Sequence, residues 1–263
     1  MQADYHMHTV LCKHAEGDIA EYVEAARKKG IPEICFTDHV PAPDGYDAIN
    51  RMTLDQFPAY KELVAKVRDS QNPAVLFGIE ADYYEGCQDF LSKWLHQQKF
   101  DLVLGSVHFI GKWGFDGPDE MKTWAAVNVA EAWREYFKSV GKLADTGMYD
   151  VFGHLDLPKK FGFRPSDKQQ KEMVQPALDR IAAAGMAIEL NTSGLRRPVK
   201  EIYPSPLILQ LAHEREIPIT FGSDSHAPSQ VGFNFSEALK LARDCGYTQC
   251  ARFRQRGKTL VGL

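Results

Sequence analysis

The stretch DYHMHT at residues 4–9 contains two histidines, His6 and His8, separated by a single residue. Because side chains alternate across an extended strand, both imidazoles would point to the same side. Imidazole nitrogens bind zinc and other transition metals. Another imidazole, that of His14, follows shortly after. This spacing alone leaves three interpretations open: chance, an exposed surface feature, or two ligands of one metal ion.

The positions of the other histidines help to choose among these three interpretations. Of the nine histidines in the chain, His96 and His213 fall within helical patterns, where a surface or packing role is expected. The other seven lie on strand-like runs or directly after them, and two acids lie at the same level. Together these are the candidate metal ligands His6, His8, His14, His39, Glu80, His108, His154, Asp224 and His226.

This set of side chains predicts a metal centre. A ring of buried polar groups without partners would be costly, and bound metal ions would satisfy it. Imidazoles and carboxylates without thiolates suit zinc, manganese or iron. Nine ligands are more than one tetrahedral zinc ion uses, so we expect two or three divalent metal ions.

Seven strand-like runs must position these residues, at 3–9, 33–39, 74–83, 101–110, 149–157, 186–194 and 217–226. Amphipathic helical patterns separate the runs. In the first of these patterns, apolar side chains recur at helical spacing at Ile19, Tyr22, Val23 and Ala26. Asp18 is the expected N-cap, Glu21 can complete a capping box, and Gly30 is expected to end the helix.

The order of these elements predicts the fold. Apolar strands that alternate with helices indicate a parallel sheet covered on both faces. Seven such units favour an α/β barrel over an open sheet. Residues 250–253 could add a short eighth strand. The chain has no Gly-x-Gly-x-x-Gly after the first run and no Walker loop, which disfavours the nucleotide-binding open sheets. No linker or repeat divides the sequence, so we expect one domain over residues 1–263.

Long loops follow four of the strand-like runs, at residues 40–53, 111–121, 157–166 and 194–204. In α/β barrels, loops after the strands build the active site.

Composition narrows the class of protein. The net charge is −4 and no run of lysines and arginines occurs, so we expect no nucleic-acid partner. The five cysteines include no Cys-x-x-Cys pair, which predicts neither a disulfide framework nor a zinc ribbon. Neither a signal peptide nor a membrane-spanning stretch is recognisable, and we therefore expect a cytoplasmic protein without a membrane partner. The sequence carries no signal for an oligomeric state.

The motifs HMHT, TDH, GIE, GSVH, GHLDL and GSDSH, together with His14, resemble in order those of the polymerase and histidinol phosphatase (PHP) superfamily. The resemblance runs from the first strand-like run to the last. Four shorter motifs, PKKFGFRP, NTSGLRRP, YPSP and WGFDGPDE, resemble the histidinol-phosphate phosphatases within that superfamily.

The resemblance implies a distorted (β/α)7 TIM-like barrel with a trinuclear site. His6, His8, Glu80 and Asp224 would hold the first metal. Glu80 would bridge to the second, held also by His108 and His154, and the third would be held by His14, His39 and His226. It also implies hydrolysis of L-histidinol phosphate to L-histidinol and phosphate, a step of histidine biosynthesis, by a metal-activated hydroxide.

Further side chains are expected to serve this reaction. The planar guanidinium group matches phosphate oxygens, and Arg164 and Arg196 follow the fifth and sixth runs, on the side of the metal ligands. Arg197 is the neighbour for which a surface role is as plausible. Asp224 and the bridging Glu80 are the expected catalytic residues. Asp224 or a metal-bound water would give a proton to the leaving alcohol.

Two other functions remain open at this stage. The same chemistry could act on another phosphate ester, such as a nucleotide or a sugar phosphate. The chain could also be a metal-binding or proofreading-associated module without enzymatic activity. Its length and its arginine-bearing loops argue against the second alternative.

Overall fold

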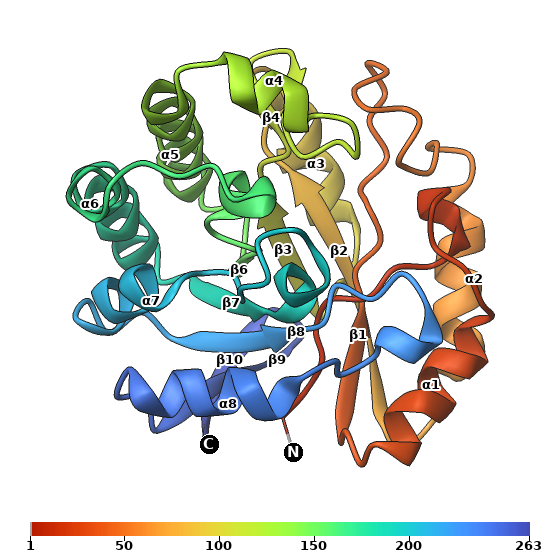
Figure 1. Cartoon of the computed structure of the whole chain (residues 1–263). Coiled ribbons are helices and arrows are strands. Elements are labelled where there is room, and N and C mark those ends of the chain that lie inside the picture. Colours follow the sequence, from red (N-terminus) through yellow and green to blue (C-terminus); the bar gives the residue numbers. More distant parts are fainter. Residues whose placement is uncertain (1) are drawn as a thin grey trace.

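The computed structural model describes residues 2–263 (Figure 1). At its centre is a six-stranded parallel sheet in the order β1-β2-β3-β6-β7-β8. These strands are β1 (Glu33–Phe36), β2 (Ala74–Asp82), β3 (Leu102–Ser106), β6 (Val151–Phe152), β7 (Ala187–Asn191) and β8 (Ile219–Gly222). The short strands β4 (Phe109–Ile110) and β5 (Trp113–Gly114) form a separate antiparallel pair after β3.

Helices surround the outer side of the curled sheet (Figure 1). They are α1 (Ile19–Lys28), α2 (Phe57–Arg68), α3 (Gln88–Gln97), α4 (Met121–Ala126), α5 (Val129–Asp145), α6 (Asp167–Ala183), α7 (Pro206–His213) and α8 (Phe235–Asp244). Helix α1 begins as predicted, because Asp18 caps it and Glu21 completes the capping box. Gly30, just after its end, has a φ of +66°, a conformation that favours glycine.

The first strand-like run differs from its prediction. Residues 3–9 lie between β8 and β1 and are hydrogen-bonded to both, but they form only two isolated parallel bridges, Asp4 with Ile34 and Met7 with Ser225. Side chains interrupt the regular ladder here: the Asp4 carboxylate accepts the backbone N–H of Ser223, and Thr37 accepts that of Met7. The segment still joins the two edge strands, so the sheet closes into a distorted barrel.

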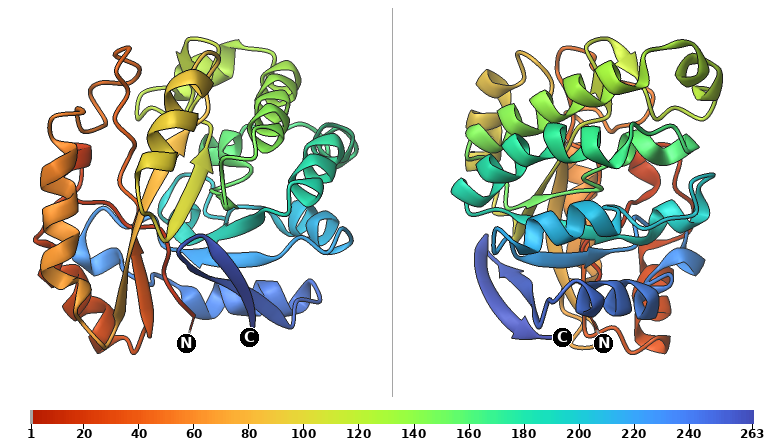
Figure 2. Two further views of the ribbon diagram at one scale, coloured as in Figure 1. Left: turned by 180° about the vertical axis from the view of Figure 1, so that it is seen from behind. Right: turned by 60° about the vertical axis from the view of Figure 1, so that its left-hand side comes forward.

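The chain ends in an antiparallel hairpin instead of an eighth barrel strand. Strands β9 (Gln249–Arg254) and β10 (Gly257–Gly262) pair with each other and lie across one end of the barrel, beside both termini (Figure 2). Ala251 and Phe253 of the hairpin pack into a cluster with Tyr5, Cys35 and residues of the other strands. The hairpin therefore closes the barrel at the end opposite to the loops that follow the strands.

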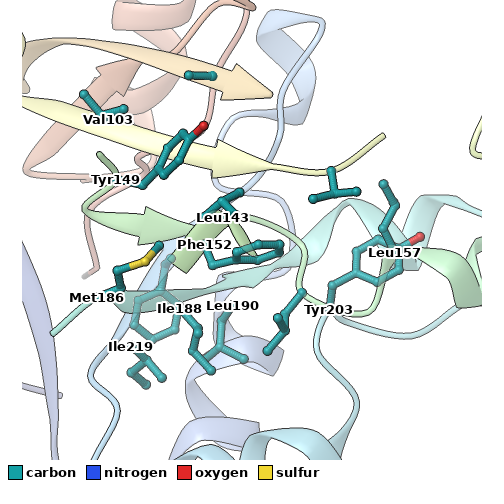
Figure 3. Packing of buried hydrophobic residues seen from close by; sticks show 14 of the residues in the cluster. Val103, Leu143, Tyr149, Phe152, Leu157, Met186, Ile188, Leu190, Tyr203 and Ile219 are labelled. Carbon is teal, nitrogen blue, oxygen red and sulfur yellow. The ribbon is translucent and has the colours of Figure 1, made fainter. Parts of the chain in front are cut away.

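A larger hydrophobic core separates the sheet from the helices. Figure 3 shows part of it, in which Phe152 of β6 lies among Leu143, Ile188 and Leu190. The same cluster contains residues from Met7 to Cys250. This shared core supports the single domain expected over residues 1–263, which stays a prediction.

Candidate metal centre

The nine predicted ligands converge at the carboxyl ends of the strands. The N-terminal segment places His6 and His8 between β8 and β1, and His39 pairs with Glu80 through a parallel bridge just beyond β1. The remaining members follow β3, β6, β8 or the short helix at Val10–Cys12, and they are His108, His154, Asp224, His226 and His14. Segments far apart in the sequence therefore supply one cluster, as the spacing predicted.

Glu80 lies at the middle of this cluster. Its Oε2 is 3.4 Å from Nε2 of His6, 3.5 Å from Nε2 of His8 and 3.0 Å from Nδ1 of His39. Its Oε1 is 3.1 Å from Nε2 of His154 and 3.7 Å from Nε2 of His108. One carboxylate thus faces two separate groups of imidazoles, which is the arrangement that a bridging ligand requires.

Asp224 faces the other side of the same histidines. Its Oδ1 is 3.8 Å from Nε2 of His6, 3.5 Å from Nε2 of His8 and 3.5 Å from Nδ1 of His226. Asp224 and His154 both adopt left-handed backbone conformations, with φ of 51° and 32°. Such conformations are unfavourable for residues other than glycine and concentrate at functional sites.

The ligand atoms also form groups of the size that one ion needs. Four such groups, each with donor atoms within 4.8 Å of one another, are His6–His8–Asp224, His6–Glu80–His154, His8–His39–Glu80 and His14–His39–His226. Because His6, His8, His39 and Glu80 each belong to two groups, the groups overlap. A cluster of ions a few ångströms apart fits this overlap better than a single ion does.

Several atoms of the cluster are buried and, although some lie close to an opposite charge, none of them makes a hydrogen bond of suitable geometry among residues 2–263. They are His6 Nε2, His8 Nδ1 and Nε2, His39 Nδ1, Glu80 Oε2, His154 Nδ1 and His226 Nε2. His6 and His8 are fully buried, so water cannot satisfy them freely. Unpaired buried polar groups cost free energy, and divalent cations would remove that cost. The residues present therefore fit a metal centre.

The electrostatics of the cluster agree with this fit. Burial raises the pKa of Glu80 and Asp224, but the surrounding histidines outweigh burial and hold both values well below the ordinary range. Burial lowers the pKa of His8, but Asp224, Asp38 and Glu80 raise it to about 9. The pKa of His14 falls to about 4, through burial and the charges of His8 and His39. The site thus combines two ionised carboxylates with imidazoles in both protonation states.

Two acids that the sequence analysis did not single out hold ligands in place. Oε1 of Glu189, on β7, is 2.8 Å from Nδ1 of His6, and its Oε2 accepts the backbone N–H of His154 at 2.9 Å. Oδ2 of Asp82, at the end of β2, is 3.0 Å from Nδ1 of His108 and 3.1 Å from Nη2 of the buried Arg51. Carboxylates that accept the second ring N–H of a histidine fix its tautomer and orientation.

Two further acids, Asp38 and Asp156, lie next to predicted ligands in the sequence. Alternation along a strand would turn Asp38 to the side opposite His39, yet its Oδ1 is 3.5 Å from Nδ1 of His8. The strand ends at Phe36, so strict alternation no longer applies at Asp38. Asp156 shares a strand-like run with His154, but its carboxylate accepts the backbone N–H of Ser205 and pairs with Lys159 instead.

The two predicted phosphate ligands lie in the loops after β6 and β7. Nη2 of Arg196 donates to the carbonyl oxygens of Ser223 and Asp224 at 2.8 and 3.0 Å. Its Nη1 is buried and has no hydrogen-bond partner within the described chain. Arg164 is more exposed, and its Nη2 lies 3.0 Å from Oε2 of Glu201. Arg196 is therefore adjacent to the metal ligands, while Arg164 is held by an acid of the neighbouring loop.

Fold and site together define the class of this protein: an α/β barrel with clustered imidazoles and carboxylates at the carboxyl ends of its strands. No helix within residues 2–263 has the length and apolar character needed to cross a bilayer.

The chain belongs to the PHP domain family, whose pattern matches residues 4–193, and residues 206–238 match the PHP-associated family. A probable histidinol-phosphatase of Deinococcus radiodurans is 42% identical over 248 residues, which cover 92% of this chain and 93% of the relative. The histidinol-phosphatase of Bacillus subtilis is 28% identical, over 90% of this chain and 98% of its own length.

Solved structures have the same fold. The histidinol phosphate phosphatase of Lactococcus lactis, crystallised with zinc, L-histidinol and phosphate, superposes with a TM-score of 0.80 and 24% identity, over 98% of both chains. A putative histidinol phosphatase of Listeria monocytogenes gives a TM-score of 0.77 at 24% identity, over 90% of this chain and 99% of that one. The distorted TIM-like barrel expected from the sequence is therefore confirmed.

Proposed function

We propose that this protein hydrolyses L-histidinol phosphate to L-histidinol and inorganic phosphate, as a phosphoric monoester hydrolase of histidine biosynthesis. The observation that carries the proposal is the group of buried, unpartnered imidazole and carboxylate atoms around Glu80 and Asp224, next to an arginine with a free Nη1. The names of the Deinococcus and Bacillus relatives support the choice of substrate.

The nine ligands would hold two or three divalent ions, with zinc, manganese and iron suited to this donor set. When bound, such ions lower the pKa of a water molecule and stabilise negative charge on phosphoryl oxygens. Glu80 would bridge two of them, because its two oxygens face different imidazoles. Glu189 and Asp82 would keep His6 and His108 oriented, with the Nε2 atoms directed at the centre.

The arginines would bind the phosphate group of the substrate. Nη1 of Arg196 would donate to one phosphoryl oxygen, since Nη2 is already used by the backbone at Ser223 and Asp224. Arg164 would donate to another from the loop after β6. Charge-assisted hydrogen bonds of this kind stabilise the charge that spreads over the phosphoryl oxygens during transfer.

Asp224 is the proposed residue for proton transfer. Its Oδ2 accepts the hydroxyl of Ser193 at 3.0 Å, whereas its Oδ1 faces the histidines. It could receive a proton from the attacking water and pass one to the leaving alcohol. The low pKa that the histidines impose keeps this carboxylate ionised before the reaction.

The substrate is a small phosphate monoester, and neither nucleic acid nor membrane is a proposed partner. We place the reaction in the cytoplasm, where the five buried, unpaired cysteines of the described chain would stay reduced.

A phosphate-release assay on the metal-loaded protein tests the proposal. Histidinol phosphate should be the best substrate in a panel that includes nucleoside monophosphates and sugar phosphates, and a chelator should abolish its turnover. Equal or faster release from a nucleotide or sugar phosphate would overturn the proposed substrate. Metal content without phosphate release from any ester would overturn the proposed enzymatic activity.

A further inference from the structure

Lys159 is fully buried. It lies in the short helical turn Leu157–Phe161, near the start of the loop that follows β6. Its Nζ is 2.9 Å from Oδ2 of Asp156 and 3.0 Å from Oε2 of Glu201, and it donates to the carbonyl oxygen of Ile202 at 2.7 Å. An ammonium group has three N–H donors. Three oxygens therefore lie within 3.0 Å of this fully buried ammonium group, one as a hydrogen-bond acceptor and two as ion-pair partners.

These partners belong to the two loops that carry the arginines. Asp156 lies in the loop after β6, whereas Glu201 and Ile202 lie in the loop after β7. Oε2 of Glu201 is shared, because it also lies 3.0 Å from Nη2 of Arg164. Lys159 thus reaches Arg164 through a single carboxylate, and it joins that arginine's loop to the loop of Arg196.

The charges of this connection are balanced, with Lys159 and Arg164 opposite Asp156 and Glu201. Burial raises the pKa of Glu201, but Lys159 and Arg164 outweigh burial and lower it below the ordinary value. Nζ of Lys159 also lies 5.2 Å from the centre of the Tyr203 ring, a cation–π distance. Glu201 is therefore an ionised ion-pair partner for both Lys159 and Arg164.

The connection continues toward the metal ligands. Asn191 and Tyr203 exchange backbone hydrogen bonds of 2.7 and 2.9 Å, which fold the β7 loop back onto its strand. Nδ2 of Asn191 donates to Glu189 at 2.9 Å, and Glu189 contacts His6. The loop that Lys159 holds is thus fixed to the same strand that orients a candidate metal ligand.

A buried ion pair is a poor way to gain stability, because an apolar residue of similar size often serves as well. What this ion pair adds is a fixed geometry between two loops. We propose that Lys159 is a positioning residue for phosphate recognition: through Glu201 it fixes Arg164 relative to the neighbouring loop that carries Arg196. This inference rests on the proposed function, which assigns both arginines to the phosphate.

The test measures binding of inorganic phosphate to the metal-loaded full-length chain by calorimetry, for the unaltered protein, Lys159→Met, Arg164→Met and the double variant. Each single substitution should weaken phosphate binding, Lys159→Met by about tenfold and Arg164→Met by about 10- to 100-fold. Because Lys159 acts through Arg164, the double variant should bind within about twofold of Arg164→Met alone.

Lys168→Met is the matched control, since Lys168 is an exposed lysine of α6. It should bind phosphate as the unaltered protein does. Metal content should be the same in all of these variants, because no metal ligand is changed. A merely structural role for Lys159 would predict additive losses in the double variant, and additive losses would overturn the inference.

Glu201→Gln keeps the test decisive if Lys159→Met does not fold. This substitution leaves Lys159 paired with Asp156 and Ile202 and removes only the charge that holds Arg164. Glu201→Gln should also weaken phosphate binding. When combined with Arg164→Met, it should weaken binding no more than Arg164→Met does alone. If Glu201→Gln binds phosphate normally, the inference is wrong while the proposed function survives. If the unaltered, metal-loaded protein binds no phosphate, the inference is also wrong, whereas the proposed function is overturned only if no phosphate is released from any ester.

Discussion

Nδ1 of His6 lies 2.8 Å from Oε1 of Glu189, and both side chains are almost completely buried. Burial lowers the pKa of His6, but Glu189, Asp224 and Glu80 outweigh burial and raise it well above the ordinary value. With Nδ1 donating to Glu189, Nε2 of His6 is left to face Glu80 and Asp224. Glu189 therefore determines which nitrogen of His6 is available to a metal ion.

Glu189→Gln should lower metal affinity by about 10- to 100-fold, the usual effect of losing a carboxylate that orients a metal-binding histidine. Competition with a chromophoric chelator would measure the affinity. Glu214→Gln, at an exposed position after α7, is the control and should bind metal normally. Unchanged affinity in Glu189→Gln would show that Glu189 does not orient a ligand.

His8→Ala and Asp224→Asn should each lower phosphate release by more than about a hundredfold, because each removes a proposed ligand of the reactive centre. Metal analysis of the same preparations should show fewer ions per chain. His96→Ala, on the exposed side of α3, should retain both metal and activity. Full activity of either site variant would contradict the ligand assignment.

Arg196→Met should weaken product inhibition by inorganic phosphate by about 10- to 100-fold, since one charged hydrogen bond would be lost. Arg197→Met is the comparison, because Arg197 is the adjacent arginine of the same loop and is partly exposed. The inhibition constant of phosphate for each variant is the measurement. A larger effect in Arg197→Met would reassign the phosphate contact to that neighbour.

Metal binding should release protons at neutral pH. In the metal-free chain the pKa of His8 is about 9, and that of His108 is about 10 because Asp82 outweighs burial. Both imidazoles are therefore protonated at pH 7 and must lose a proton to bind a metal ion, so apparent metal affinity should rise between pH 6 and pH 9. His14, with a pKa of about 4, is already neutral there and adds no proton.

Calorimetry in two buffers with different heats of ionisation would count the protons released at pH 7. Metal binding that releases no proton, or that weakens as the pH rises over this range, would contradict the proposed protonation of His8 and His108.

Phe253→Ala should lower the free energy of unfolding by about 3–5 kcal/mol, because the hairpin buries this ring at the closed end of the barrel. Denaturant unfolding would measure the change. Leu260→Ala, on the same hairpin but 50% exposed, should change it by less than about 0.5 kcal/mol. Equal effects of the two substitutions would mean that the hairpin does not seal the barrel.

The convergence of the candidate metal ligands could be predicted from the sequence because parallel strands bring their carboxyl ends to one edge, whereas their role as ligands stays a prediction. The spacing of His6 and His8, and the placement of His39, Glu80 and Asp224 at the ends of apolar runs, followed from this rule alone. Glu189 was missed, although a glutamate within the apolar run AIELN is itself a sign of a buried carboxylate with a partner. Asp82 was missed although it follows Glu80 at the same two-residue spacing.

The hairpin could not be assigned from local pattern. Its turn uses Gln255 and Arg256 in left-handed conformations, with φ of 49° and 64°. Two-residue hairpin turns usually contain Asn-Gly or Gly-Gly, and Gln-Arg is not such a sequence, so the turn could not be recognised from the residues. Residues 250–253 were therefore considered as a barrel strand. Residues 3–9 were predicted as the first of seven strands, but the contacts of the Asp4 and Thr37 side chains that interrupt its ladder depend on tertiary structure.

The contact between Asp4 and Ser223 joins positions 219 residues apart, and it fixes the segment of His6 and His8 against the loop of Asp224 and His226. Such distant pairings form late and slowly during folding. On the ribosome, a nascent chain would expose its first histidines long before their partners are synthesised. The full set of candidate ligands, and with it the closing contact between the first segment and the loop after β8, is therefore complete only once residue 226 has been synthesised.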